Sequence, residues 1–217
     1  MKKLAYKFNN HHSEIITVQH ALNLKKKNPQ YWGDNGFYDL IKLRKMYPVD
    51  RCGPSSSFSF QGQTGASHGK GSKGITHELV QQYLCLKEDF SFKIFGKQID
   101  LKVKNAFEEW CVVDPNDPSK KVYIDCCLEL DRTCAWYGFF GGKIGFEITD
   151  TSKTNRRKIN LLNKLGLFVF ELTTIPEWHI KNDDKVTAEE LKILKARIRG
   201  YLNSVQSMSA LSLPKRI

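Results

Sequence analysis

The order of the predicted elements indicates an α/β (α+β) fold, in which a mixed sheet is flanked by helices. Three observations carry this prediction. A helical pattern begins at Thr76, several strand-like stretches follow it, and an amphipathic helix over residues 155–165 then leads into another apolar strand. The chain before Thr76 has a different composition and is treated separately.

Residues 1–50 are predicted to form a helical, basic extension. Ile15, Val18 and Leu22 recur at helical spacing ahead of a run of lysines, and a second periodic set precedes the helix breaker Pro48. Residues 51–75 are rich in Gly and Ser, which predicts a linker loop with a short strand at "FSF".

Residues 76–206 are predicted to form the core of the protein. The stretch "THELVQQYLCL" places Leu79, Tyr83 and Leu86 on one helical face. Strand-like stretches follow in "FSFKIF", "QIDLKV", "EEWCVVD" and "KVYIDCCLEL", with a turn at "PNDPSK". Gly141 and Gly142 separate "CAWYGFF" from "KIGFEIT" and predict a hairpin between them.

The last part of this core is predicted to be a helix, a buried strand and a second helix. The helix over residues 155–165 ends at Gly166, and "LFVFEL" is apolar on both sides, as in a strand buried within a sheet. Thr187 and Glu190 form a capping box for the final helix. Residues 207–217 are predicted to be a frayed tail.

The composition is that of a soluble globular protein, with 41% hydrophobic and 26% charged residues among 217. No apolar run approaches the roughly 18 residues of a membrane span, and the first residues contain no signal-peptide core. We therefore expect a cytoplasmic protein without a membrane partner. The six cysteines form no CxxC pair, which favours reduced thiols over disulfides or a zinc site.

The net charge is the most informative bulk property. The chain holds 34 Lys and Arg against 23 Asp and Glu, a formal charge of +11. Such an excess favours an anionic partner, and nucleic acid is the commonest one for a soluble protein. The alternative is a generally basic surface without a specific partner.

Two carboxylates lie within apolar strand stretches, Asp125 in "KVYIDCCLEL" and Glu147 in "KIGFEIT". A carboxylate in such a strand is costly unless it is paired, hydrogen-bonded or bound to a cation. Mg²⁺ suits a pair of carboxylates, since water and phosphate oxygens complete its coordination. One alternative is that Glu147 faces solvent on an edge strand. Another is that Asp125 caps the end of a strand or closes a turn with Lys120 or Lys121.

The stretches "YIDCCLEL" and "GFEITDTSKTNRRKINLLNKLGLFVFEL" together resemble the core of the PD-(D/E)XK nuclease superfamily. Within it the closest likeness is to the competence protein CoiA-like branch, and "THELVQQYL" resembles the helix that precedes that core. The likeness extends roughly over residues 76–172. It implies a restriction-endonuclease-like sheet and a nuclease that hydrolyses phosphodiester bonds with Mg (or Mn).

The resemblance also implies roles for individual residues. Asp125 and Glu147 would hold the metal, and Glu78 would be a third carboxylate, carried by the preceding helix. Thr149 stands two residues after Glu147, where the superfamily has a lysine that positions water and stabilises negative charge. Lys158, one turn into the following helix, could reach back to replace that lysine.

The basic residues that follow Glu147 are candidate contacts for the phosphate backbone. They are Lys153, which could also replace the missing lysine, and Arg156 and Arg157. His77 is a further candidate, because the branch carries a histidine in the preceding helix. The structural alternatives are an exposed helix face for the arginines and a surface position for His77.

These observations lead to a metal-dependent endonuclease as the first hypothesis, acting on DNA rather than RNA. The second is a catalytically inactive, nuclease-like module that binds nucleic acid or regulates another protein, because Thr149 replaces the lysine. A third is a protein-interaction factor whose basic surface meets an acidic protein. The sequence leaves open whether the chain forms a homodimer.

Overall fold

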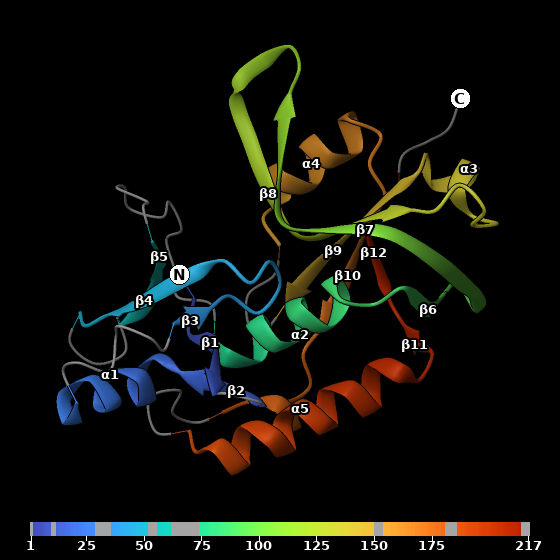
Figure 1. Cartoon of the computed structure of the whole chain (residues 1–217). Coiled ribbons are helices and arrows are strands. Elements are labelled where there is room, and N and C mark those ends of the chain that lie inside the picture. The colour runs from blue at the N-terminus through green and yellow to red at the C-terminus, as the bar shows by residue number, and fades with distance from the viewer. Residues whose placement is uncertain are drawn as a thin grey trace. The chain divides into compact units, whose positions relative to one another are not determined.

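The structure is a computed structural model, and it describes residues 2–9, 12–28, 36–51, 56–61, 74–149, 154–180 and 186–213. These residues form a mixed α+β fold, as the sequence predicts, but with two sheets in place of the single predicted one (Figure 1). The chain divides into two compact units. The first comprises Met1–Leu79 and Trp178–Ala196, and the second comprises Val80–Glu177 and Arg197–Ile217.

The first unit is built on an antiparallel five-stranded sheet in the order β2-β1-β3-β4-β5. Its elements are β1 (Leu4–Asn9), β2 (His12–Thr17), α1 (Val18–Lys27), β3 (Phe37–Tyr38), β4 (Lys45–Val49) and β5 (Ser57–Phe60). Helix α1 begins at its N-cap Thr17, whose side chain accepts a hydrogen bond from the His20 amide.

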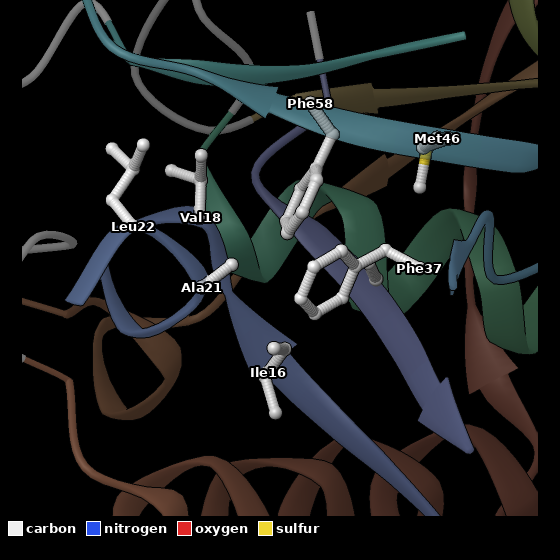
Figure 2. Close-up of a cluster of buried hydrophobic side chains, with 8 residues drawn as sticks. Ile16, Val18, Ala21, Leu22, Phe37, Met46 and Phe58 are labelled. Atoms are coloured by element: carbon white, nitrogen blue, oxygen red, sulfur yellow. The ribbon is translucent and has the colours of Figure 1, made fainter. Parts of the chain in front are cut away.

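The core of this unit lies between α1 and one face of the sheet. Buried side chains from all five strands and from α1 meet there (Figure 2), namely Ala5, Ile16, Val18, Ala21, Leu22, Phe37, Met46 and Phe58. The first residues of the chain therefore bury a hydrophobic cluster of their own, which an extension would lack.

The prediction that residues 1–50 form a helical extension is wrong, although its helix at Val18 exists. Ile15 lies on strand β2, and it is Ile16, with the opposite orientation in the strand, that enters the core. Phe37 begins strand β3 rather than a helix, and Pro48 lies within strand β4. The predicted strand at "FSF" is confirmed as β5, whereas most of the predicted linker over residues 51–75 lies outside the described residues.

The second unit contains a seven-stranded sheet in the order β11-β6-β7-β8-β9-β10-β12. Its strands are β6 (Asp89–Ile94), β7 (Lys97–Asp114), β8 (Asp117–Leu130), β9 (Lys143–Thr149), β10 (Val169–Thr173), β11 (Gln206–Ser207) and β12 (Ser209–Ser212). The pairs β9–β10 and β6–β11 are parallel, and the other neighbours are antiparallel. The prediction of a frayed tail over residues 207–217 is wrong where the structure describes it. Ser207 lies in β11 and Ser209–Ser212 form β12, the two outer strands of the sheet.

Helices connect and cover these strands. They are α2 (Ile75–Cys85), α3 (Tyr137–Phe140), α4 (Arg156–Lys164) and α5 (Ala188–Asn203), with a 3-10 turn at Pro176–Trp178. Helix α4 forms the crossover between the parallel strands β9 and β10 (Figure 1), and Leu162 on it packs against Val169 and Ile124. The boundaries of α2, α4 and α5 agree with the predicted helices.

The predicted hairpin at Gly141 and Gly142 is wrong in its first arm. "CAWYGFF" contains the short helix α3, which ends at Gly141 with φ 66° in the left-handed region that glycine favours. Strand β9 pairs instead with β8, beginning at Glu129 opposite Lys143. The aromatic residues of α3 pack in the core, where Phe140 contacts the ring of Phe168.

Among the described residues, no helix is long and apolar enough to cross a membrane.

Candidate active site

Glu147 is buried at the centre of the second sheet. Its side chain is on strand β9, which lies between β8 and β10, and the residue is only 6% exposed. The alternative of a solvent-facing residue on an edge strand is therefore excluded. The parallel register places Glu147 beside Glu171 of β10.

Asp125 lies in the middle of the neighbouring strand β8, and its carboxylate reaches across to β9. The last residues paired between the two strands are Cys126 and Phe146, so Asp125 and Glu147 are the next residue on each strand. The Oδ2 atom of Asp125 accepts a hydrogen bond of 2.9 Å from the backbone amide of Ile148. Asp125 is therefore not a strand-end residue, and the two carboxylates share one location.

The regular alternation of β8 is interrupted at Asp125. A Cβ atom at Gly145 would lie 3.1 Å from the side chain of Ile124, so Ile124 is on the Gly145 side of the sheet. Cys126, two residues later, pairs with Phe146, which points to the opposite side. In a regular strand Ile124 and Cys126 would share a face, so the irregularity occurs at the residue whose carboxylate reaches β9.

The side chain of Gln81 on α2 fixes the backbone of β8 at Asp125, and Gln81 was not among the residues expected at the site. The side chain is buried, and its Nε2 donates to the backbone oxygen of Asp125 at 2.5 Å and to Oε1 of Glu109 at 3.2 Å. Glu109 on β7 is the residue opposite Asp125 and has φ 50°. No local signal marked Gln81, because it is two residues from both Leu79 and Tyr83 and so lies off the predicted buried face of the helix.

Lys158 forms an ion pair with Glu147, with Nζ 2.6 Å from Oε1. It is the third residue of α4, whose N-cap Asn155 accepts a hydrogen bond from the Arg157 amide. Both side chains are largely buried, with 19% of Lys158 and 8% of Glu147 exposed. The structure therefore brings Lys158 back to Glu147, the contact that we expected of a relocated lysine.

The electrostatic environment of Glu147 opposes its ionisation. Burial, followed by the negative charge of Asp125, raises the pKa of Glu147 to about 7 from an ordinary 4.5, and Lys158 acts in the opposite direction. A carboxyl that titrates near neutral pH in a carboxylate pair is typical of functional sites.

Thr149 does not point to Lys158 but is engaged with the next strand. Its hydroxyl donates a hydrogen bond of 2.6 Å to Oε1 of Glu171. Glu171 thus joins the site region, although the sequence analysis passed over it. The signal was present, because "VFEL" has a carboxylate in an apolar strand just as "GFEI" does.

Glu78 and His77 lie in the part of α2 that belongs to the first unit, whereas Asp125 and Glu147 belong to the second. The Glu78 carboxylate accepts hydrogen bonds from the backbone amides of Lys3, at 2.5 Å, and Leu4, at 3.0 Å. Glu78 therefore has a structural contact within the first unit, and its expected role as a third site carboxylate stays a prediction. His77 is half-buried.

The other basic candidates differ in how they are placed. Arg156 and Arg157 are exposed in the first turn of α4, two residues and one residue before Lys158. Lys153 lies outside the described residues. Lys143, at the start of β9, has its Nζ 5.3 Å from the centre of the Trp110 ring.

Comparisons of the chain with models of protein families, with curated proteins and with solved structures found no match. Any functional conclusion consequently depends on the chemistry of the residues described above.

The donor set formed by Asp125 and Glu147 fits a hard divalent cation. Mg²⁺ is bound through one or two carboxylates and keeps several waters, so two protein ligands suffice. In the described part of the chain no group of three or more His, Cys, Asp and Glu residues is arranged to hold a metal. The cysteines among the described residues are all free thiols.

Proposed function

We propose that the chain is a metal-dependent nuclease that hydrolyses phosphodiester bonds, with DNA the favoured substrate. The observation that carries the proposal is the grouping of Asp125, Glu147 and Lys158, in which two carboxylates lie at adjacent positions of neighbouring strands and a lysine from the following helix pairs with one of them, Glu147. This combination of two acids and one base is what the resemblance to the PD-(D/E)XK superfamily requires.

Each of the three side chains has a definite task in this proposal. Asp125 and Glu147 would hold Mg (or Mn), which supplies activation of the attacking water and neutralisation of charge on the phosphate. Lys158 keeps a positive charge beside Oε1 of Glu147 and stabilises the negative charge that develops on the phosphate oxygens. The exposed Arg156 and Arg157 bind the phosphate backbone near the same helix end.

A second candidate is an inactive nuclease-like module that binds nucleic acid or regulates another protein. It is favoured by Thr149, which occupies the lysine position and is hydrogen-bonded to Glu171 rather than directed to the carboxylate pair. The two candidates share a nucleic-acid partner and differ in whether cleavage occurs.

The test is a cleavage panel with single- and double-stranded DNA and RNA in Mg²⁺, Mn²⁺ or EDTA. We expect cleavage that requires the metal and falls about a hundred-fold or more in Asp125→Ala and in Glu147→Ala. Glu129→Ala is the matched control, because Glu129 is a carboxylate of the same strand β8 and is hydrogen-bonded to Asn105. Circular dichroism and thermal melting establish that each variant is folded.

The outcomes separate the candidates. Metal-dependent cleavage that is lost in both site variants and kept in Glu129→Ala supports the nuclease. Binding of nucleic acid without cleavage of any substrate supports the inactive module. Absence of binding at low salt contradicts both and favours a protein partner.

A further inference from the structure

The outer face of the first unit's sheet carries a group of aromatic side chains. The antiparallel register pairs Tyr6 of β1 with Tyr38 of β3, and Tyr38 with Lys45 of β4. Paired residues share a face, and residues two apart on a strand do as well, so Phe8 and Tyr47 belong to the same face. We call Tyr6, Phe8, Tyr38, Lys45 and Tyr47 the aromatic face.

This face is opposite to the one that forms the core of the unit. Phe37 and Met46, which are next to Tyr38 and Lys45 along the chain, point inward and are 0% and 2% exposed (Figure 2). The aromatic face is therefore not needed to bury the hydrophobic cluster of the sheet. Its side chains require another explanation than packing beneath α1.

The rings of the aromatic face are arranged side by side and reach solvent. The ring centres of Tyr6 and Phe8 are 6.0 Å apart, and those of Phe8 and Tyr38 are 5.2 Å apart in an edge-to-face arrangement. Phe8 is 43% exposed and Tyr47 is 41% exposed. Single exposed aromatic residues are ordinary, but here four rings lie on the same face of three neighbouring strands, and three of them contact one another.

One cation lies on this face, and the part of the chain that forms its sheet has a positive net charge. Lys45 is exposed on the face, directly beside Tyr38 in the register. The first 79 residues contain 12 Lys and Arg against five Asp and Glu. Rings that offer stacking surfaces, together with a positively charged surrounding, are the combination by which proteins hold single-stranded nucleic acid.

We propose that the aromatic face binds single-stranded nucleic acid, with bases stacked on Phe8 and Tyr47 and the backbone held by Lys45. A duplex is a poorer ligand, because its bases are already stacked on one another and cannot meet the rings. The site is separate from the Asp125 and Glu147 pair, which belongs to the other unit. The inference thus goes beyond the proposed function and does not depend on it.

The test measures equilibrium binding of a fluorescent single-stranded oligonucleotide to the full chain by anisotropy. The measurement is made in EDTA, so that cleavage plays no part and a failure of the nuclease proposal leaves it unaffected. We expect Phe8→Ala and Tyr47→Ala each to weaken binding about ten-fold, while Tyr47→Phe, which keeps the ring, stays near the wild type. A duplex of the same sequence should bind more weakly than the single strand.

Two controls separate stacking from general effects. Phe95→Ala removes an aromatic side chain that is 82% exposed in the second unit, and it should leave affinity unchanged. Lys45→Ala should lower the slope of log affinity against log salt by about 0.7, whereas Phe8→Ala should leave that slope intact. Because Phe8 also contacts its neighbours, thermal melting of each variant accompanies the binding data.

The proposal is overturned if both alanine variants bind within about two-fold of the wild type while remaining folded. It is also overturned if Phe95→Ala weakens binding as much as they do. If instead Phe8→Ala converts a dimer into a monomer in sedimentation velocity and leaves nucleic-acid affinity unchanged, the face is a contact between copies of the chain.

Discussion

At the scale of the residue, the buried position of the Glu147 carboxylate costs free energy when no cation is bound. A buried carboxylate needs compensation, and Glu147 receives it from Lys158 while Asp125 acts against it. The pKa near 7 is the result of this conflict. A divalent cation between the carboxylates would allow both to ionise, because it exchanges their repulsion for attraction to a shared positive charge.

Metal binding should therefore depend on pH around neutrality. Below the Glu147 pKa of about 7 a proton competes with the metal, so affinity for Mg²⁺ or Mn²⁺ should fall by up to about ten-fold per pH unit between pH 7 and pH 5. Titration calorimetry of the full chain measures this dependence. Glu147→Gln should bind the metal weakly at every pH, and an affinity that is flat from pH 8 to pH 5 in the wild type would contradict the assignment.

The role of Lys158 can be tested by removing this lysine and by placing a lysine at position 149 instead. Lys158→Ala should lower kcat about a hundred-fold by removing the positive charge beside Glu147, and Lys158→Arg should lower it less. The double variant Thr149→Lys with Lys158→Ala should recover about ten-fold over Lys158→Ala alone, since Thr149 is two residues from Glu147 on the same face of β9.

Single-turnover cleavage rates at saturating metal give these comparisons. Lys164→Ala is the matched control, because Lys164 pairs with Asp114 at the other end of the same helix. Activity that is unaffected by Lys158→Ala would remove Lys158 from the site. The sequence offered both Lys158 and Lys153 for this place and could not choose between them, because the residue of the first turn that faces the strand depends on how the helix packs.

At the scale of the element, the sequence predicted what local pattern alone determines. The helix α4 and its stop at Gly166, the buried strand β10, and the capping box of Thr187 and Glu190 all occur as expected. Short strands of the first unit were misread. A strand such as "HSEIIT" that runs directly into a helix produces apolar residues at helical spacing by coincidence.

Contacts between distant elements could not be predicted in this way. Gln81 and Asp125 are far apart in the sequence, and nothing local to "LVQQYL" marks the glutamine as a partner of an irregular strand. The pairing of Thr149 with Glu171 likewise depends on the parallel register of β9 and β10, which is a property of the assembled sheet.

Gln81 should act as a positioning residue for Asp125. Gln81→Ala leaves a buried backbone oxygen without its donor, which costs about 1–3 kcal/mol of stability, and it frees the irregular segment of β8. We expect kcat for cleavage to fall about ten-fold with little change in KM, because Gln81 does not bind substrate.

The comparison is with Gln98→Ala, which removes an exposed glutamine that hydrogen-bonds Asp100 at the start of β7. A purely structural role for Gln81 would lower the melting temperature but leave the apparent metal affinity unchanged. The positioning role predicts that affinity for Mn²⁺ falls as well. Unchanged metal affinity and kcat in a folded Gln81→Ala protein would contradict it.

At the scale of the whole molecule, the chain consists of two units that each have their own sheet and buried residues. The change in composition near residue 75 indicated a boundary, but the sequence analysis attributed no core to the first part. The second unit carries the candidate active site and the first carries the aromatic face. If both proposals hold, variants of the aromatic face should lower nucleic-acid binding without removing the residues proposed for cleavage.

Glu78 makes the stability of the first unit dependent on pH. Burial raises its pKa to about 7 from an ordinary 4.5, despite the opposing effect of Lys2 and of the two amides that it binds. The folded chain therefore retains a proton that the unfolded chain releases as the pH rises from 4.5 to 7. The associated stability is complete below pH 4.5 and is lost as the pH passes through 7.

We expect this contribution to be about 3 kcal/mol, the free-energy equivalent of the difference between the two pKa values. The measurement is the difference in unfolding free energy between the wild type and Glu78→Gln at pH 5 and at pH 8. The advantage of the wild type should shrink by this amount towards pH 8, because glutamine does not titrate. Glu189→Gln, an exposed glutamate in the first turn of α5, controls for the loss of one negative charge. A difference that is constant between pH 5 and pH 8 would show that Glu78 is ionised over this range, with the buried carboxylate stabilised by Lys2 and by its two backbone amides.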